Sequence, residues 1–160
     1  MCGIAGVISL NKKIHSVSTV NKMTNIIQHR GPDGEGFWTS EQSDIIFGHR
    51  RLSIIDLSSN GAQPLIRNNY VITYNGEVYN YKELRDQLIS FGFIFKSACD
   101  TEVIINAYIH WGEKCVDYFN GMWAFAIFDP IKNQIFCSRD RYGIKPFYYF
   151  ITNDQFYFAS

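Results

Sequence analysis

The residue best placed to carry chemistry is Cys2, which follows the initiator methionine in the sequence Met1-Cys2-Gly3. Because the cysteine side chain is small, we expect Met1 to be removed, which leaves Cys2 with both a thiol and an α-amino group. A terminal amine has a pKa of about 7.7–8.0 and can accept a proton near neutral pH. The nucleophile would then bring its own base, as an N-terminal threonine does. A cysteine at this position can also be incidental, and the pattern alone leaves both interpretations open.

The other three cysteines, Cys99, Cys115 and Cys137, show no spacing that suggests chemistry. No C-x-x-C pair occurs, and no group of cysteines and histidines has the spacing of a zinc site. We therefore predict reduced, partly buried thiols and no metal site.

The elements that must position Cys2 follow from hydrophobic periodicity and turn residues. The sequence predicts strands over residues 4–9, 35–38, 45–49, 70–74, 123–128, 134–138, 147–151 and 155–158. It predicts helices over residues 20–28, 80–92 and 100–112, with Gly92 and Gly112 as stops. Antiparallel hairpins with inserted helices indicate an α+β fold, in which sheet packs on sheet and helices lie outside.

Three local patterns have simple structural interpretations. Asn75-Gly76 is typical of a type I′ hairpin turn. Asn80, with Glu83 three residues later, looks like a helix cap with its reciprocal partner. Asp100 is a good candidate for the N-cap of the last predicted helix.

Composition excludes several classes of protein. The 160 residues suit a single domain, and 46% apolar residues with 16% aromatics are enough for a packed core. Fifteen basic residues balance fifteen acidic ones, so neither nucleic acid nor an anionic membrane is an expected partner. The first residues have neither a basic leader nor a long apolar segment, and we expect a cytoplasmic protein.

Several sequence blocks occur together, and in order they resemble the class II glutamine amidotransferases. The blocks are MCGI (1–4), HRGPD (29–33), GHRRLSIID (48–56), GAQP (61–64), YNGEVYN (74–80), DTEVI (100–104) and RDRYGIKP (139–146). The resemblance covers essentially the whole chain. The GPD, RRLSIID and GAQP forms are most similar to the glutamine-hydrolysing asparagine synthetase branch.

The resemblance implies a fold and a domain organisation. The fold would be the N-terminal-nucleophile (Ntn) hydrolase sandwich, with four αββα layers in which two antiparallel sheets are flanked by helices. Residues 1–160 would form the glutaminase domain, excised from a longer chain. In the family, that longer chain carries a C-terminal ATP-dependent synthetase domain.

The resemblance also assigns roles to residues. Cys2 would be the nucleophile, and Asn75 and Gly76 would form the oxyanion hole. The substrate-binding residues would be Arg51, Leu52, Ile54, Ile55, Glu77 and Asp100. Arg51 would hold the α-carboxylate of glutamine, whereas Asp100 and Glu77 would hold its α-ammonium. We expect Arg50 to be a surface residue, and His29, Arg30 and His49 to be structural.

The implied reaction is hydrolysis of glutamine to glutamate and ammonia through a cysteine thioester. The glutaminase domain would need no cofactor, whereas the synthetase domain would use ATP and Mg²⁺ to amidate a carboxylate, most simply converting aspartate to asparagine. The expected partners are glutamine and the synthetase domain, and a homodimer is possible. The alternatives are a glucosamine-phosphate synthase-like branch, a catalytically silent glutamine-sensing module, and a structural β-rich domain.

Overall fold

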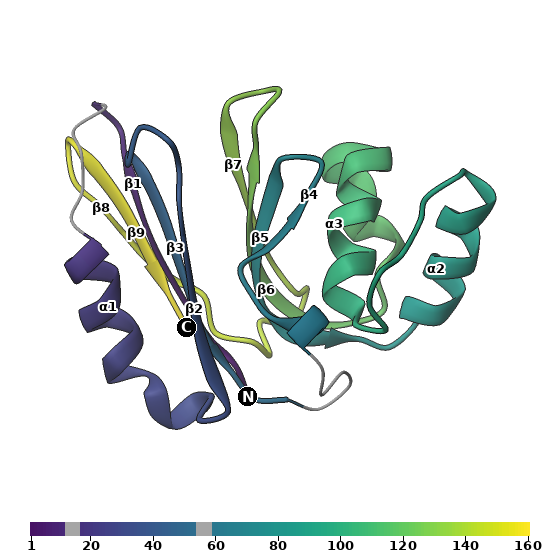
Figure 1. Ribbon diagram of the computed structural model, residues 1–160, viewed down its shortest axis with the longest axis horizontal. Helices are drawn as coiled ribbons and strands as arrows, with labels where there is room; N and C mark the ends of the chain where they lie inside the picture. Colours follow the sequence, from purple (N-terminus) through teal and green to yellow (C-terminus); the bar gives the residue numbers. More distant parts are fainter. Residues whose placement is uncertain (12–16, 54–58) are drawn as a thin grey trace.

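In the computed structural model, which describes residues 1–11, 17–53 and 59–160, two antiparallel sheets face each other. One helix covers the outer face of the first sheet, and two helices lie outside the second sheet (Figure 1). These four layers confirm the predicted α+β sandwich. None of the helices in the described ranges is long and apolar enough to cross a membrane.

The first sheet has five strands and contains the start of the chain. In spatial order its strands are β2 (Gly34–Thr39), β3 (Ile45–Arg51), β1 (Gly3–Ser9), β9 (Gln155–Ala159) and β8 (Tyr148–Ile151). β1 is central because it pairs with β3 on one side and β9 on the other. Its residues are almost all buried, as its apolar sequence predicts.

The second sheet has four strands and contains the YNGEVYN block. Its strands are β4 (Leu65–Arg67), β5 (Tyr70–Val78), β6 (Gly121–Asp129) and β7 (Gln134–Arg139). Apolar side chains of both sheets fill the space between them, among them Ile4, Phe47, Val71 and Phe158.

The helices cover the outer faces. They are α1 (Val17–Ile26), α2 (Tyr81–Ser90) and α3 (Asp100–Trp111), with short 3-10 turns η1 (Gln28–Arg30), η2 (Ser59–Gly61) and η3 (Gly112–Tyr118). α1 packs on β1 and β3, α3 packs on β5, and α2 packs on α3. Gly92 and Gly112 have positive φ values of 92° and 62° just beyond α2 and α3, which confirms both predicted helix stops.

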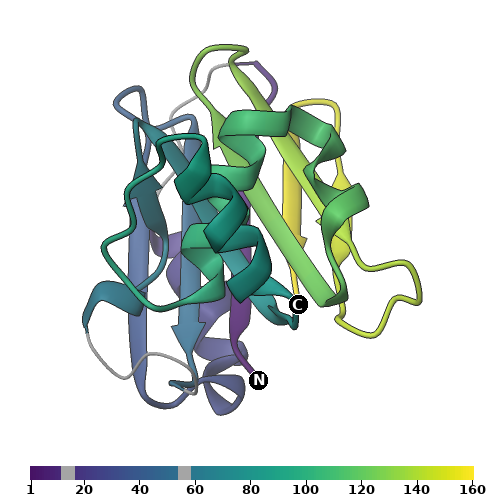
Figure 2. The same cartoon turned by 90° about the vertical axis from the view of Figure 1, so that its right-hand side faces the viewer.

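The two ends of the chain meet beside the central strand. Ser160 donates its backbone N–H to the Ile4 carbonyl at 3.0 Å, and its hydroxyl accepts from the Ile4 N–H at 3.0 Å. Figure 2 shows both termini at the same end of the molecule. This contact fixes the start of β1 directly after Cys2.

The structure corrects one predicted strand boundary and adds a strand. β5 does not end at Tyr74 but continues to Val78, so Asn75-Gly76 lies inside a strand and is not a hairpin turn. Asn75 pairs with Ala124 and Gly76 with Trp123 of β6. The short strand β4 was not predicted, because three residues give too little periodicity.

Asn80 occupies the predicted N-cap position of α2, but neither predicted side-chain cap forms. The Asn80 side chain makes no capping bond to α2; it donates to the Tyr118 carbonyl and accepts from the Asn120 N–H, both at 2.9 Å. Cys99 occupies the N-cap position of α3, and Asp100 is the first helical residue. The side-chain oxygens of Asn80 and Asp100 therefore accept from residues distant in sequence.

Candidate active site

The predicted site residues that the structure describes lie in one cleft, at the end of the sandwich where β1 begins and β3 ends. The register of β1 against β3 pairs Gly3 with Arg50 and so brings Cys2 beside Arg51. The cleft is lined by Met1, Cys2, Arg51, Leu52, Ser53, Gly61, Gln63, Tyr74, Asn75, Gly76, Glu77, Cys99, Asp100, Thr101 and Lys145. Residues far apart in sequence thus share one concave surface.

The Cys2 thiol is half-buried against the backbone that follows β3. The Leu52 N–H points at Sγ over 3.4 Å, and Sγ lies 3.6 Å from the Leu52 carbonyl oxygen. Burial raises the pKa of the Cys2 thiol, and Asp100 adds to this, although Leu52, the chain terminus and Arg51 act in the opposite direction. Since the thiol is then protonated at neutral pH, attack requires a base.

The HRGPD block (29–33) contacts the backbone of Cys2 and of the segment that ends β3, at this end of the cleft. The Arg30 guanidinium donates to the Cys2 carbonyl at 3.2 Å. Asp33 donates its backbone N–H to the Arg51 carbonyl at 2.9 Å and accepts from the Ser53 N–H at 2.8 Å. Gly31 lies so close to the Arg50 backbone that a side-chain carbon there would come within 2.4 Å of it. The block therefore fixes the relative position of Cys2 and Arg51.

Asn75 lines the cleft and carries a buried amide donor. Its side chain is 2% exposed, and its Nδ2 has no hydrogen-bond partner among the described residues. A buried amide nitrogen without a partner costs about 1–3 kcal/mol, so such groups call for an explanation. A substrate oxygen bound in the cleft would accept from this nitrogen, which is the arrangement an oxyanion hole requires.

Gly76 has no room for a side chain. A carbon added at its Cβ position would come 2.3 Å from the Met122 carbonyl oxygen and 2.8 Å from the Trp123 Cα. Since both are backbone atoms of β6, the strand pair would have to move apart. The glycine therefore allows β5 and β6 to pair closely next to the cleft.

We expect Gly76→Ala to lower the free energy of unfolding by roughly 1–3 kcal/mol, because overpacking a fitted site forces backbone shifts. Denaturant unfolding followed by circular dichroism measures the difference. Gly34→Ala is the matched control, since the nearest atom to its added carbon is 3.8 Å away. Equal stability of the two variants would contradict the close-packing explanation.

Asp100 faces the cleft as a buried carboxylate. Its Oδ2 accepts from the Tyr74 hydroxyl at 2.7 Å and from the Val78 N–H at 3.1 Å. Burial raises the pKa of Asp100, and these hydrogen bonds partly offset that effect. Burial and the Asp100 charge also raise the pKa of Tyr74 well above its usual value, so this hydroxyl keeps its proton and donates it.

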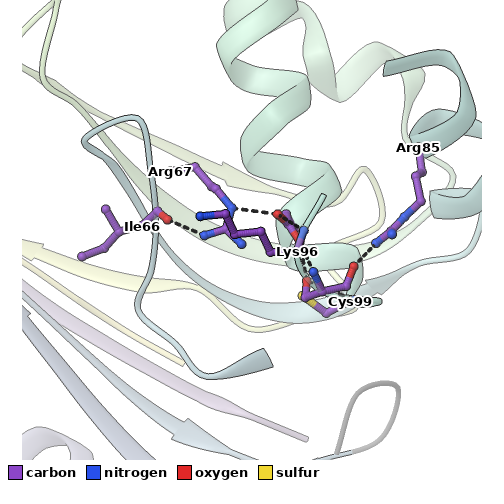
Figure 3. A network of polar contacts seen from close by, with 7 residues as sticks. Ile66, Arg67, Arg85, Lys96 and Cys99 are labelled. Carbon is purple, nitrogen blue, oxygen red and sulfur yellow. Dashed lines mark hydrogen bonds and ion pairs between the residues drawn. The ribbon is translucent and has the colours of Figure 1, made fainter. Parts of the chain in front are cut away.

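A second network holds the loop that leads into Asp100 (Figure 3). Glu102 is fully buried and accepts from the Arg67 guanidinium at 2.7 Å, and from the N–H groups of Lys96 and Ser97 at 2.9 and 2.7 Å. Although burial acts against it, these hydrogen bonds hold the pKa of Glu102 below its usual value. Arg85 of α2 donates to the Ser97 carbonyl at 2.6 Å. The loop is thereby tied to β4, α2 and α3.

The charges in the cleft suit an amino-acid head group. Asp100 and Glu77 contribute negative charge, and Arg51 at the end of β3 contributes positive charge. A ligand with one carboxylate and one ammonium group could pair with both kinds of side chain. The cleft also contains Lys145, whose Nζ lies 3.2 Å from the Met1 sulfur.

His49 has the structural role that we predicted. The predictions for Arg50 and His29 are wrong. The buried His49 Nε2 lies 3.2 Å from the Tyr74 carbonyl oxygen and so connects the two sheets; burial lowers the pKa of His49 to about 4. Arg50 was expected at the surface but is buried, bonded to the Thr24 carbonyl and paired with Glu35 at 2.7 Å. His29 is exposed, so the prediction of a buried structural group is wrong there.

The structure brings together most of the residues that the sequence singled out. Seven of them line the cleft: Cys2, Arg51, Leu52, Asn75, Gly76, Glu77 and Asp100. Ile54 and Ile55 lie outside the described residues. The cleft also contains Gln63, Tyr74, Thr101 and Lys145, for which no role was predicted although each belongs to one of the sequence blocks. Membership of those blocks was the signal that could have identified them.

Comparison with known proteins identifies the family of the chain. The model of the glutamine amidotransferase domain matches residues 1–160. The chain belongs to the glutamine amidotransferase family. This amidotransferase domain is 44% identical over its full length to the putative asparagine synthetase [glutamine-hydrolyzing] 2 of Methanocaldococcus jannaschii, and 40% identical to the asparagine synthetase [glutamine-hydrolyzing] 3 of Bacillus subtilis. It spans 34% and 26% of these relatives' lengths.

The fold of the amidotransferase domain has a solved counterpart. The glutamine phosphoribosylpyrophosphate amidotransferase of B. subtilis, complexed with ADP and GMP, superposes with a TM-score of 0.80 over 99% of this chain and 41% of that chain. At 21% sequence identity the likeness concerns the fold. It confirms the expected sandwich of two antiparallel sheets flanked by helices.

Proposed function

We propose that the amidotransferase domain hydrolyses glutamine with Cys2 as nucleophile once Met1 has been removed. The observation that carries this proposal is that Cys2 lines the same cleft as Asn75, whose buried Nδ2 has no hydrogen-bond partner among the described residues. A nucleophile and a donor for the developing oxyanion are the two groups that attack on a carboxamide requires.

The proposed chemistry begins with proton transfer. The Cys2 thiol passes its proton to its own α-amino group, directly or through water, and Sγ bonds to the side-chain carbonyl carbon of glutamine. The Asn75 amide and the Gly76 N–H stabilise the oxyanion. The carbon–nitrogen bond then breaks, the nitrogen takes up the proton and leaves as ammonia, and a γ-glutamyl thioester remains. Water cleaves the thioester to glutamate and restores the thiol.

Specificity for glutamine would come from the charged groups around the nucleophile. Arg51 suits the α-carboxylate because a guanidinium matches a carboxylate with two parallel hydrogen bonds. Asp100 and Glu77 suit the α-ammonium. A site that pairs both charges discriminates against ligands that lack one of them. We include Leu52, Ile54 and Ile55 in the proposed wall of this pocket.

The whole protein's reaction extends this proposal. We propose that ammonia passes to a C-terminal synthetase part that uses ATP and Mg²⁺ to amidate a carboxylate, most simply aspartate to asparagine. The support is that the relatives named as asparagine synthetases are about three to four times longer than this chain. We also propose a cytoplasmic location, where a reducing environment keeps the Cys2 thiol available.

Release of ammonia and glutamate from glutamine tests the proposal, with the Met1-free protein compared with a form that retains Met1. We expect equal amounts of both products from the Met1-free form and none from the other, because the Met1-blocked Cys2 has no free amine. Intact mass identifies each form and detects a glutamyl adduct on the enzyme. Equal rates from the two forms would contradict the N-terminal mechanism.

A further inference from the structure

Tyr74 contacts several residues of the cleft, although the proposed reaction gives it no role. It is 2% exposed, and its hydroxyl donates to Asp100. Its ring lies against Gly76, since its Cε2 is 2.6 Å from the position of a carbon added there. Asn75 follows it directly along β5. One side chain thus connects the carboxylate of the cleft with the strand that carries the oxyanion donors.

The backbone of Tyr74 is fixed from both sides. β4 begins at Leu65, opposite Ile72, so the strand does not extend far enough to bond the Tyr74 N–H. The Gln63 side chain takes the place of the strand by accepting from this N–H at 2.7 Å, and it donates to Thr101 of α3 at 3.3 Å. The His49 ring lies at 3.2 Å from the Tyr74 carbonyl oxygen. The hydroxyl is therefore held in place before any ligand binds.

Among the described residues, Tyr74 is the only side chain that donates to the Asp100 carboxylate. The Val78 N–H donates to the same oxygen at 3.1 Å. Without the hydroxyl, Asp100 would keep only backbone N–H donors, those of Val78, Thr101 and Asp100 itself. The orientation of the carboxylate toward the cleft therefore depends on Tyr74.

We propose that Tyr74 is a positioning residue that orients Asp100 toward the ammonium group of the substrate and so sets the affinity for glutamine. This inference rests on the proposed function. Tyr74 acts through Asp100, whereas Cys2 and Asn75 act on the amide at the other end of the substrate. Its hydroxyl therefore determines ground-state binding and contributes little to the bond-breaking step.

Loss of the hydroxyl also changes the pH dependence of binding. Because the Tyr74 hydrogen bond lowers the pKa of Asp100, its removal raises that pKa further. Glutamine binding needs the ionised carboxylate, so affinity would begin to fall at a higher pH as the solution is acidified. The other titratable or charged groups that line the cleft remain in the variant, and they are the N-terminal amine, Cys2, Arg51, Glu77, Cys99 and Lys145.

The test uses Tyr74→Phe, which keeps the ring and its packing. Calorimetric titration of glutamine into Cys2→Ala protein, with and without Tyr74→Phe, measures the dissociation constant without turnover. We expect Tyr74→Phe to weaken binding about tenfold, as for loss of one hydrogen bond to a charged group. The pH below which the affinity for glutamine falls, the acid limb of the binding curve, should also move to a higher value. In the protein with Cys2 intact, KM should rise by a similar factor while kcat changes less than about twofold.

Tyr108→Phe is the matched control. Tyr108 is equally buried, and its hydroxyl donates to the buried Asp129 at 3.0 Å, but neither residue lines the cleft. We expect its dissociation constant and acid limb to equal those of the parent. Equal binding by the Tyr74→Phe and parent proteins would overturn the inference alone. Absence of glutamine binding in the parent would overturn the proposed function, and with it this inference.

Discussion

Cys2→Ala is expected to abolish release of ammonia from glutamine, with a loss of at least about 10⁴-fold in kcat, as when other nucleophiles are removed. Alanine keeps the terminal amine and the start of β1 but removes the sulfur that forms the thioester. A coupled glutamate assay on protein whose Met1 removal has been verified by mass measures the loss. The stability of the fold should change little, since the hydrogen bonds of the thiol within the described residues are long contacts of 3.4 and 3.6 Å with Leu52.

Cys137→Ala provides the comparison for Cys2→Ala. Cys137 is also partly buried and unpaired, but it lies in β7 and does not line the cleft. Its kcat should stay within about twofold of the parent, since substitutions distant from a site rarely alter it. Residual turnover in Cys2→Ala above a tenth of the parent rate would show that another group performs the attack.

Asn75→Ala is expected to lower kcat by about 10²–10³-fold with a much smaller change in KM, which is the usual effect of losing one oxyanion donor. The amide nitrogen has no partner among the described residues, so losing this nitrogen breaks no hydrogen bond to them. Steady-state kinetics with glutamine separates the two constants. The effect should fall on the step in which negative charge develops on the carbonyl oxygen.

Asn106 provides an unusually close control for Asn75. It is 3% exposed, and its Nδ2 likewise lacks a partner among the described residues, but it belongs to α3 and does not line the cleft. Asn106→Ala should leave kcat within about twofold of the parent. If both alanine variants lose activity to the same extent, the Asn75 amide acts on the fold and not on the oxyanion.

The sequence predicted the fold class and most of the cleft because these depend on short-range patterns. Short runs of apolar residues located β1, β3 and β6, and glycines located the ends of α2 and α3. The block pattern then assigned Cys2, Arg51, Asn75 and Asp100 to one site without any knowledge of distances.

The errors arose where a long-range contact outweighs a local preference. Asn75-Gly76 favours a turn by itself, but pairing along the whole of β6 keeps it extended. Asp100 favours a helix cap, but its carboxylate instead bonds to Tyr74, which is 26 residues earlier in the chain. Such bonds join residues whose proximity depends on the complete topology. No window of sequence could reveal them.

The burial of Asp100 also has a thermodynamic consequence. Its pKa is raised from 3.8 in the folded state, so its contribution to stability is present in acid and lost as the pH rises through the folded value. Asp140 has the opposite linkage: four backbone N–H groups, those of Trp123, Tyr142, Ile144 and Lys145, lower its pKa, and its contribution is lost only in acid. Above the pKa of each group, then, Asp140 strengthens the fold, whereas the ionised Asp100 weakens it. Ionised Asp100 is a destabilising charge in the cleft that we propose binds the substrate, a trade of stability for recognition.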